Sequence, residues 1–179
     1  VAIALRSSGI HSNGFSLVRK IIENSGASLD SSAPFESDAD YLGAALMTPT
    51  RIYRKAAATA LTTGGVSGIV HVTGGGLIEN PPRVFGDKIS FRFDCAAMPL
   101  PPVFSWIRDA GNMELPELAR TFNCGIGLII YVDASKADKV LGALRTGPEP
   151  EAYIVGELVK RGDQPAVILE GVDNWRRQA

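Results

Sequence analysis

The chain has 179 residues, and 18 Lys and Arg against 19 Asp and Glu give it a formal net charge of −1. With 45% hydrophobic and 21% charged residues, it can form a core for one compact domain or at most two small ones. The balanced charge argues against binding to nucleic acid or to a membrane surface, because both normally need a basic face. Two cysteines, Cys95 and Cys124, are too few for a disulfide scaffold, which favours a reducing, cytoplasmic setting.

The N-terminal half begins with a short apolar run over residues 1–6, which predicts a buried strand. Neither Met nor a polar leader precedes this strand, so we expect that the chain is cut from a larger protein. A cluster of turn residues follows, and the polar stretch over residues 25–40 is expected to be a surface loop. Helices are predicted over residues 17–24, 41–47 and 51–61, with Pro49 as a breaker and Thr50 as a possible cap.

The C-terminal half is more regular. Apolar patterning predicts strands over residues 89–94, 126–132, 152–159 and 166–169. Helices are expected over residues 103–110 and 117–122, and from a cap at Ser135 to residue 144. The order of these elements predicts an α+β fold, an α/β sandwich in which helices cover a mixed, largely antiparallel sheet, with partial ferredoxin-like character. We expect residues 1–179 to form a single domain.

The first candidate site is the glycine-containing turn between the first strand and the first helix. A turn at the positive end of a helix dipole directs backbone N–H groups outward, which favours binding of a phosphate. In the alternative interpretation, Ser12 or Asn13 only caps the helix and His11 lies on the surface. The candidate phosphate-binding residues are Gly9, His11, Ser12, Asn13 and Gly14.

The second candidate site is the run of three glycines, Gly74, Gly75 and Gly76, just after His71. Each glycine would cost about 1 kcal/mol in a helix relative to alanine, so the run is better explained by a ligand or another segment that approaches the backbone closely. His71 is either a core histidine or a group with a direct catalytic role. Glu79 and Asn80 face the same cavity in one interpretation and form an exposed polar pair in the other.

The third candidate is Asn123, which lies in a turn before the most apolar strand. It either orients a substrate or only forms the turn. Metal binding is not predicted, because His11, His71, Cys95 and Cys124 have no ligand spacing of the CxxC or HxxxH kind. The sequence also contains neither a Walker A motif nor GxGxxG.

Together these stretches resemble aminoimidazole ribonucleotide (AIR) synthetase, also called phosphoribosylformylglycinamidine cyclo-ligase. The resemblance covers roughly residues 1–160 and only the C-terminal half of that enzyme, and it is least at Arg6, over residues 25–40 and over residues 160–179. The four stretches that carry it are Ser7-Ser8-Gly9-Ile10-His11-Ser12-Asn13-Gly14-Phe15-Ser16-Leu17-Val18-Arg19, Thr48-Pro49-Thr50-Arg51-Ile52-Tyr53, His71-Val72-Thr73-Gly74-Gly75-Gly76-Leu77-Ile78-Glu79-Asn80-Pro81-Pro82-Arg83-Val84 and Arg120-Thr121-Phe122-Asn123-Cys124-Gly125-Ile126-Gly127.

The resemblance implies an ATP-dependent ring closure of formylglycinamidine ribonucleotide to aminoimidazole ribonucleotide, ADP and phosphate in purine biosynthesis. It further implies that the complete enzyme uses ATP and Mg²⁺, and that the metal is held by an N-terminal half that this chain lacks. The complete enzyme is expected to be a homodimer. This fragment is expected to need no cofactor and to be inactive alone. Within this chain, the resemblance assigns phosphate binding to residues 9–14, lining of the cleft to Gly74–Gly76, substrate orientation to Asn123 and an acid/base role to His71.

Two other functions are compatible with parts of the pattern. One is a non-catalytic phosphate-binding or assembly module of the same ATP-using superfamily. The other is a different enzyme of that superfamily, such as a selenophosphate synthetase or a thiamine-phosphate kinase, but the combination of the first and fourth stretches disfavours it.

Overall fold

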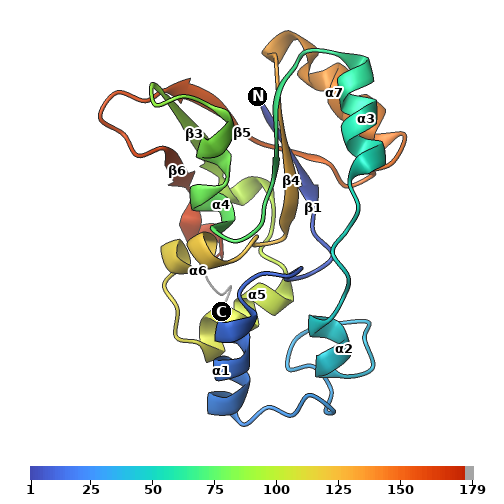
Figure 1. The fold of residues 1–179 in the computed structure, drawn as a ribbon, viewed down its shortest axis with the longest axis vertical. Helices are drawn as coiled ribbons and strands as arrows, with labels where there is room; N and C mark the ends of the chain where they lie inside the picture. Colours follow the sequence, from blue (N-terminus) through green and yellow to red (C-terminus); the bar gives the residue numbers. More distant parts are fainter. Residues whose placement is uncertain (176–179) are drawn as a thin grey trace.

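A computed structural model describes residues 1–175, and its centre is a six-stranded sheet (Figure 1). The strands lie in the order β2-β4-β1-β5-β3-β6, and every neighbouring pair is antiparallel except β3 and β6, which are parallel. This confirms the predicted α+β fold with a mixed, largely antiparallel sheet. The strands are β1 (Ala2–Arg6), β2 (Val66–His71), β3 (Ile89–Asp94), β4 (Ile126–Val132), β5 (Tyr153–Lys160) and β6 (Val167–Glu170).

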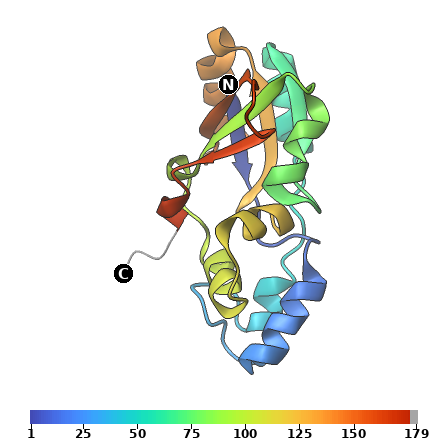
Figure 2. The same ribbon diagram turned by 90° about the vertical axis from the view of Figure 1, so that its left-hand side faces the viewer.

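Seven α-helices are described, and five of them form two groups (Figure 1). Helices α3 and α7 lie side by side against one part of the sheet, whereas α1, α2 and α5 lie beyond one end of it (Figures 1 and 2). No helix in the described part of the chain is long and apolar enough to cross a membrane. The helices are α1 (Phe15–Ser25), α2 (Leu42–Leu46), α3 (Arg54–Thr63), α4 (Gly76–Glu79), α5 (Pro102–Ala110), α6 (Leu115–Thr121) and α7 (Ala137–Arg145).

Strand β4 has no polar face because it is covered on both sides, and all seven of its residues are buried. Alternate residues of β4 and β1 point to opposite faces of the sheet. Ile3, Leu5 and Ile130 pack with residues of α3 and α7 in one cluster. Ala4 and Tyr131 belong to a second, larger cluster on the other face. This explains why the sequence shows a continuous apolar run at β4 rather than an alternating one.

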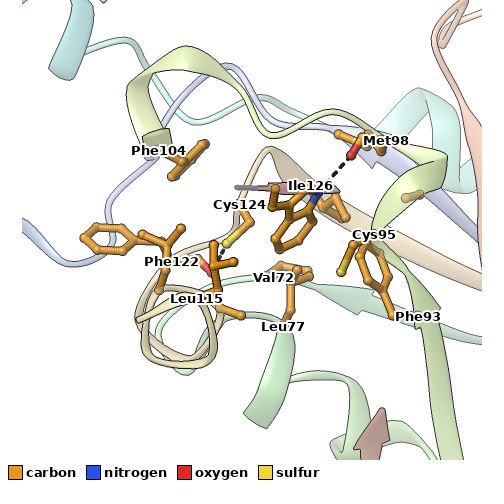
Figure 3. Packing of buried hydrophobic residues seen from close by; sticks show 14 of the residues in the cluster. Val72, Leu77, Phe93, Cys95, Met98, Phe104, Leu115, Phe122, Cys124 and Ile126 are labelled. Carbon is orange, nitrogen blue, oxygen red and sulfur yellow. Dashed lines mark hydrogen bonds between the residues drawn. The ribbon is translucent and has the colours of Figure 1, made fainter. Parts of the chain in front are cut away.

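The larger cluster connects the sheet to the helices below it. Figure 3 shows Phe122 and Cys124 from the turn before β4, and Ile126 at the start of β4, next to Phe104 of α5 and Leu115 of α6. The C-terminal segment closes this cluster, since the indole N–H of Trp175 donates to the Met98 carbonyl at 3.0 Å. The cluster therefore fixes the position of the turn that leads into β4.

Several predicted boundaries differ from the observed ones. Helix α3 begins at Arg54, not residue 51, and its N-cap residue is Tyr53, so Thr50 does not cap it. Tertiary contacts override the local helical pattern here, because the Tyr53 hydroxyl donates to the Arg6 carbonyl at 2.6 Å and holds residues 51–53 against the end of β1. Ser135 likewise lies in a short 3₁₀ turn, and α7 begins two residues later without a capping side chain.

The topology also explains where a site can form. Both β1 and β2 run antiparallel to β4 on its two sides, so β1 and β2 share one direction. Their C-terminal ends therefore meet at one edge of the sheet, on either side of the residues that start β4. The first and second glycine-containing stretches follow these two ends, and Asn123 precedes β4.

We predict that Tyr131→Phe leaves the free energy of unfolding unchanged or raises it by up to about 1 kcal/mol. The Tyr131 side chain is buried, and its hydroxyl has no hydrogen-bond partner within residues 1–175. Tyr53→Phe is the matched control, and it is expected to lose about 1 kcal/mol because its hydroxyl does have a partner. Urea denaturation of both variants measures the difference, and a loss above 1 kcal/mol for Tyr131→Phe would contradict the prediction.

Candidate functional site

Asn123 fastens the segment after β1, residues 7–14 (the first loop), to the turn before β4. Its side-chain oxygen accepts from the Ser7 hydroxyl at 3.0 Å and from the Gly125 N–H at 2.8 Å. Its side-chain NH₂ donates to the Gly9 carbonyl at 3.0 Å. Because Asn123 is fully buried and its amide is engaged by protein groups, the structure gives it a positioning role; substrate orientation by Asn123 stays a prediction.

His11 lies inside the first loop in a left-handed conformation, with φ 55°, and is only 3% exposed. Its Nε2 accepts from the backbone N–H of Ser8 at 3.1 Å and of Arg51 at 3.5 Å. Burial, and then the positive charges of His71 and Arg51, lower the pKa of His11 to about 4. The surface position considered for His11 is therefore wrong, and the imidazole is neutral near pH 7.

His71 ends β2 and is exposed, so the alternative of a core histidine is wrong. Its ring centroid lies 6.5 Å from that of His11 and 5.9 Å from that of Tyr53. The structure thus brings the first two candidate sites together, as the strand order requires. A cavity of about 170 Å³ lies between His11 and His71, and Gly74, Gly75 and Gly76 are not among the residues that line it. Its lining is His11, Ser12, Asn13, Thr50, His71, Val72 and Thr73.

The N-terminus of α1 opens from the first loop without a capping side chain. Gly14 is the N-cap residue, with φ 72°, so the alternative in which Ser12 or Asn13 caps the helix is wrong. A side chain at position 14 would run into the ring of Phe122, which explains the glycine. Ser12 is exposed and its hydroxyl lies 3.4 Å from that of Thr50, whereas Asn13 is almost buried. Both residues line the cavity.

The second glycine-containing stretch, residues 72–76 (the glycine loop), is held by Asn80. The side-chain oxygen of Asn80 accepts from the Thr73 N–H at 2.5 Å, and its NH₂ donates to the Gly74 carbonyl at 2.9 Å. Gly76 has φ 54° and packs against backbone carbonyls of α6 and its C-terminus, so close approach of another segment explains this glycine. Gly74 differs, because the space beside its Cα is open.

Glu79 does not join this cavity. Its carboxylate pairs with the Arg120 guanidinium at 3.2 Å, and both side chains are largely exposed. Asn80 is buried rather than exposed, so neither interpretation of these two residues as a pair was correct. They separate because α4 is only one turn long and places neighbouring residues on different faces.

Three further residues support the site without having been predicted. The Arg51 guanidinium forms a 2.7 Å ion pair with Glu149, whose side chain is 6% exposed, and lies 5.9 Å from the centre of the Tyr53 ring. The Tyr53 hydroxyl and the His11 ring pack against Gly127 of β4, which has no side chain. A Cβ at position 127 would collide with both groups. Gly127 was the available signal, since a glycine within an apolar strand often marks a close approach. Nothing in the local sequence marks Glu149.

A second cavity, of about 240 Å³, opens at the start of the first loop. Its lining includes serine and threonine residues as well as aromatic and proline residues. Residues 35–37 of the long polar stretch line this cavity and therefore lie beside the site. Its lining is Arg6, Ser7, Ser8, Gly9, Phe35, Glu36, Ser37, Ala45, Thr48, Pro101, Pro102, Val103 and Phe104.

The two cysteines lie in the core, not at the site. Burial raises the pKa of the Cys95 thiol to about 12 and raises that of Cys124 still further. Both therefore remain protonated near neutral pH and act as small apolar residues. Within residues 1–175, no group of three or more His, Cys, Asp or Glu side chains is placed to hold a metal ion.

We predict that Asn123→Ala lowers the free energy of unfolding by about 2–4 kcal/mol, because it leaves buried groups of the first loop without partners. Urea denaturation measures the loss, and hydrogen exchange of the Ser7 and Gly125 amides should become faster. Asn24→Ala, an exposed change on α1, is the control and should stay within about 0.5 kcal/mol of the unchanged chain. A loss below 1 kcal/mol for Asn123→Ala would show that the amide does not hold this loop.

Known proteins resemble the chain in sequence and in structure. The family model "AIR synthase related protein, C-terminal domain" matches residues 1–168. The trifunctional purine biosynthetic protein adenosine-3 of Drosophila pseudoobscura pseudoobscura is 45% identical over 177 residues, which are 97% of this chain and 13% of that protein. The hydrogenase maturation protein HypE of E. coli shares the fold with a TM-score of 0.57 at 20% identity, over 99% of this chain and 49% of HypE.

A crystal structure of HypE in complex with ATP is also similar, with a TM-score of 0.52 at 19% identity, over 94% of this chain and 47% of that one. At these identities the two HypE structures show a common fold. The family assignment rests on the sequence: the chain belongs to the AIR synthase related proteins and corresponds to their C-terminal domain.

Proposed function

We propose that this chain is the C-terminal domain of an ATP-dependent cyclo-ligase that closes the imidazole ring of formylglycinamidine ribonucleotide. The products are aminoimidazole ribonucleotide, ADP and phosphate. The observation that carries the proposal is the convergence of the first loop and the glycine loop on one cavity beside two histidines. The 45% identity to a purine biosynthetic protein supports the same pathway.

The reaction needs two kinds of protein group. ATP phosphorylates the formyl oxygen, the amidine nitrogen then bonds to the formyl carbon, and phosphate leaves with that oxygen while the nitrogen loses a proton. Hydrogen-bond donors must therefore surround phosphate oxygens, and a base must accept the proton. Backbone N–H groups of residues 9–14 with Ser12 and Asn13 suit the first task, and Val72 and Thr73 of the glycine loop line the same cavity.

His71 is the better candidate for the proton transfer. It is exposed and lines the cavity. His11 is neutral and buried, and its Nε2 is already engaged by backbone N–H groups, which leaves it no free lone pair for a proton. The two histidines thus divide the work between proton transfer and hydrogen bonding.

The remaining parts of the reaction belong to a second half of the enzyme. The chain spans 13% of the curated relative and about half of HypE. We propose that ATP and its Mg²⁺ are held largely by an N-terminal half, that the complete enzyme is a cytoplasmic homodimer, and that this chain alone does not turn over. The HypE complex with ATP supports this, because a protein containing this fold binds that nucleotide.

Reconstitution tests the proposal directly. Co-expression of this chain with the N-terminal half of an AIR synthetase is expected to restore ATP-dependent cyclisation, whereas either part alone is expected to be inactive. Ribonucleotide binding without turnover in the joined protein would instead indicate a non-catalytic phosphate-binding or assembly module.

In the joined enzyme, we predict that His71→Ala lowers kcat by roughly 10²–10⁴-fold and changes KM much less, because it removes a proton acceptor and not a major binding group. Steady-state kinetics measure both constants. Ser67→Ala, an exposed change near the opposite end of β2, is the control and should leave both constants unchanged. If His71→Ala reduces only the stability of the fold, the acid/base role is wrong.

A further inference from the structure

One short segment borders both cavities of the site. Thr48 lines the cavity of about 240 Å³, and Thr50 lines the cavity of about 170 Å³. Pro49 lies between them in the chain, and its carbonyl accepts from the Ser8 hydroxyl at 2.7 Å. We call residues 48–50 the partition. Its position affects the shape of both cavities at once.

The partition has no regular secondary structure to hold it. It lies between the end of α2 at Leu46 and the start of α3 at Arg54. Within residues 1–175, the N–H groups of Thr48 and Thr50 form no backbone hydrogen bond, and Pro49 has no N–H. A segment of this kind can adopt many backbone conformations, so contacts made by neighbouring side chains must fix it.

Arg51, the residue that follows the partition, supplies such contacts. Its guanidinium donates to the Arg6 carbonyl at the end of β1 at 3.4 Å. The same group forms the 2.7 Å ion pair with Glu149. Neither Arg51 nor Glu149 lines either of the two cavities. The ion pair therefore holds the partition from outside the site.

Glu149 is itself placed by the turn between α7 and β5. Its N–H donates to the Leu144 carbonyl at 2.9 Å, and its carbonyl accepts from the Ala152 N–H at 3.1 Å. The Glu149 side chain is only 6% exposed, and a buried carboxylate requires a partner of opposite charge. Arg51 is that partner, so the geometry of this turn determines where the Arg51 side chain lies.

We propose that Glu149 is a positioning residue of the site, and that through Arg51 it holds the partition in the arrangement that binds the ligand. The identity of the ligand, a ribonucleotide, rests on the proposed function. The link from Glu149 to the partition follows from contacts within the chain. Glu149 also lies outside all four stretches that carry the family resemblance.

The same turn contains a second ion pair in a different environment. Glu151 lies 3.4 Å from Arg6, but its side chain is 63% exposed. Exposed ion pairs contribute little, because water and salt screen the charges. Removal of one partner from a buried pair has a larger effect, because the other charge is left without compensation. The two glutamates of this turn are thus of one type and differ in burial.

Loss of the charge on Glu149 is expected to release the partition. The Arg51 side chain is 34% exposed, so its guanidinium would turn toward water once the carboxylate is gone. The Thr50 hydroxyl lies 3.4 Å from the Ser12 hydroxyl, which is longer than an ordinary hydrogen bond between two hydroxyl groups. That contact is too weak to keep Thr50 in place, and the smaller cavity would lose one defined wall.

Hydrogen exchange of the chain, followed by NMR, tests the positioning role without any ligand. The Arg51 N–H donates to Nε2 of His11 at 3.5 Å and reports on the partition, whereas Ile130 in the centre of the sheet reports on the whole fold. Glu149→Gln should speed exchange at Arg51 about tenfold more than at Ile130. Glu149→Asp should restore part of the protection, and Glu151→Gln, the matched control, should change neither amide.

The ratio of the two exchange rates separates positioning from stability. If Glu149→Gln speeds exchange at Arg51 and Ile130 by the same factor, Glu149 only stabilises the fold and the proposal is wrong. The same holds if exchange at Arg51 does not change.

Binding in the joined enzyme tests the consequence for the site. By calorimetry, at a temperature where every variant is folded, Glu149→Gln should weaken binding of formylglycinamidine ribonucleotide about tenfold, and Glu149→Asp less. Glu151→Gln should leave the affinity within about twofold of the unchanged enzyme. Unchanged affinity in Glu149→Gln would overturn the role in binding. Failure of the unchanged enzyme to bind this ribonucleotide would reject the proposed function, and hydrogen exchange would still decide whether Glu149 holds the partition.

A double variant tests whether Glu149 acts through Arg51. Arg51→Met keeps a long side chain and removes the charge. If both residues act by one route, Arg51→Met combined with Glu149→Gln should weaken binding about as much as Arg51→Met alone. Losses that multiply in the double variant would show that Glu149 acts independently of Arg51, and the proposed route would be wrong.

Discussion

The pairing of β4 with both β1 and β2 is the constraint on which the rest of the structure depends. Because both neighbours run against β4, their ends come to the same edge of the sheet, and the first loop and the glycine loop begin there. The apolar residues of β4 are buried on both faces, so this strand cannot shift its register without exposing part of a core. The site is thus held by the most deeply buried strand, although its polar residues lie on loops.

Buried amides convert this strand pairing into a defined loop geometry. Asn123 links the first loop to the turn before β4, and Asn80 does the same within the glycine loop. Each accepts through its side-chain oxygen and donates through its NH₂ at once, which a carboxylate could not do because it has no hydrogen to donate. The glycines follow from the same packing: Gly76 lies against the carbonyls of α6, and Gly127 leaves room for Tyr53 and His11. Much of the glycine content around the site is therefore a requirement of contacts within the protein.

The sequence was sufficient for the class of the fold and for the two stretches that meet at the cavity, because strand periodicity and turn residues are local signals. It was insufficient for the environment of the histidines. His11 lies between polar residues and is buried, and His71 lies in an apolar run and is exposed, since burial depends on which elements cover a strand end. The start of α3 and the contribution of Glu149 depend on contacts between segments that are distant in the sequence. A local sequence pattern does not contain this information. The family resemblance includes residues 48–53, and their contacts with β1 and Glu149 give the physical reason.

The difference between the two histidines follows from their places relative to β4. His11 is enclosed by the first loop, Tyr53 and the backbone of Arg51, so desolvation and neighbouring positive charge both oppose its protonation. His71 ends β2 at the open side of the cavity, where water can solvate a charged ring. Two residues of one chemical type, with ring centroids 6.5 Å apart, are thereby suited to different tasks.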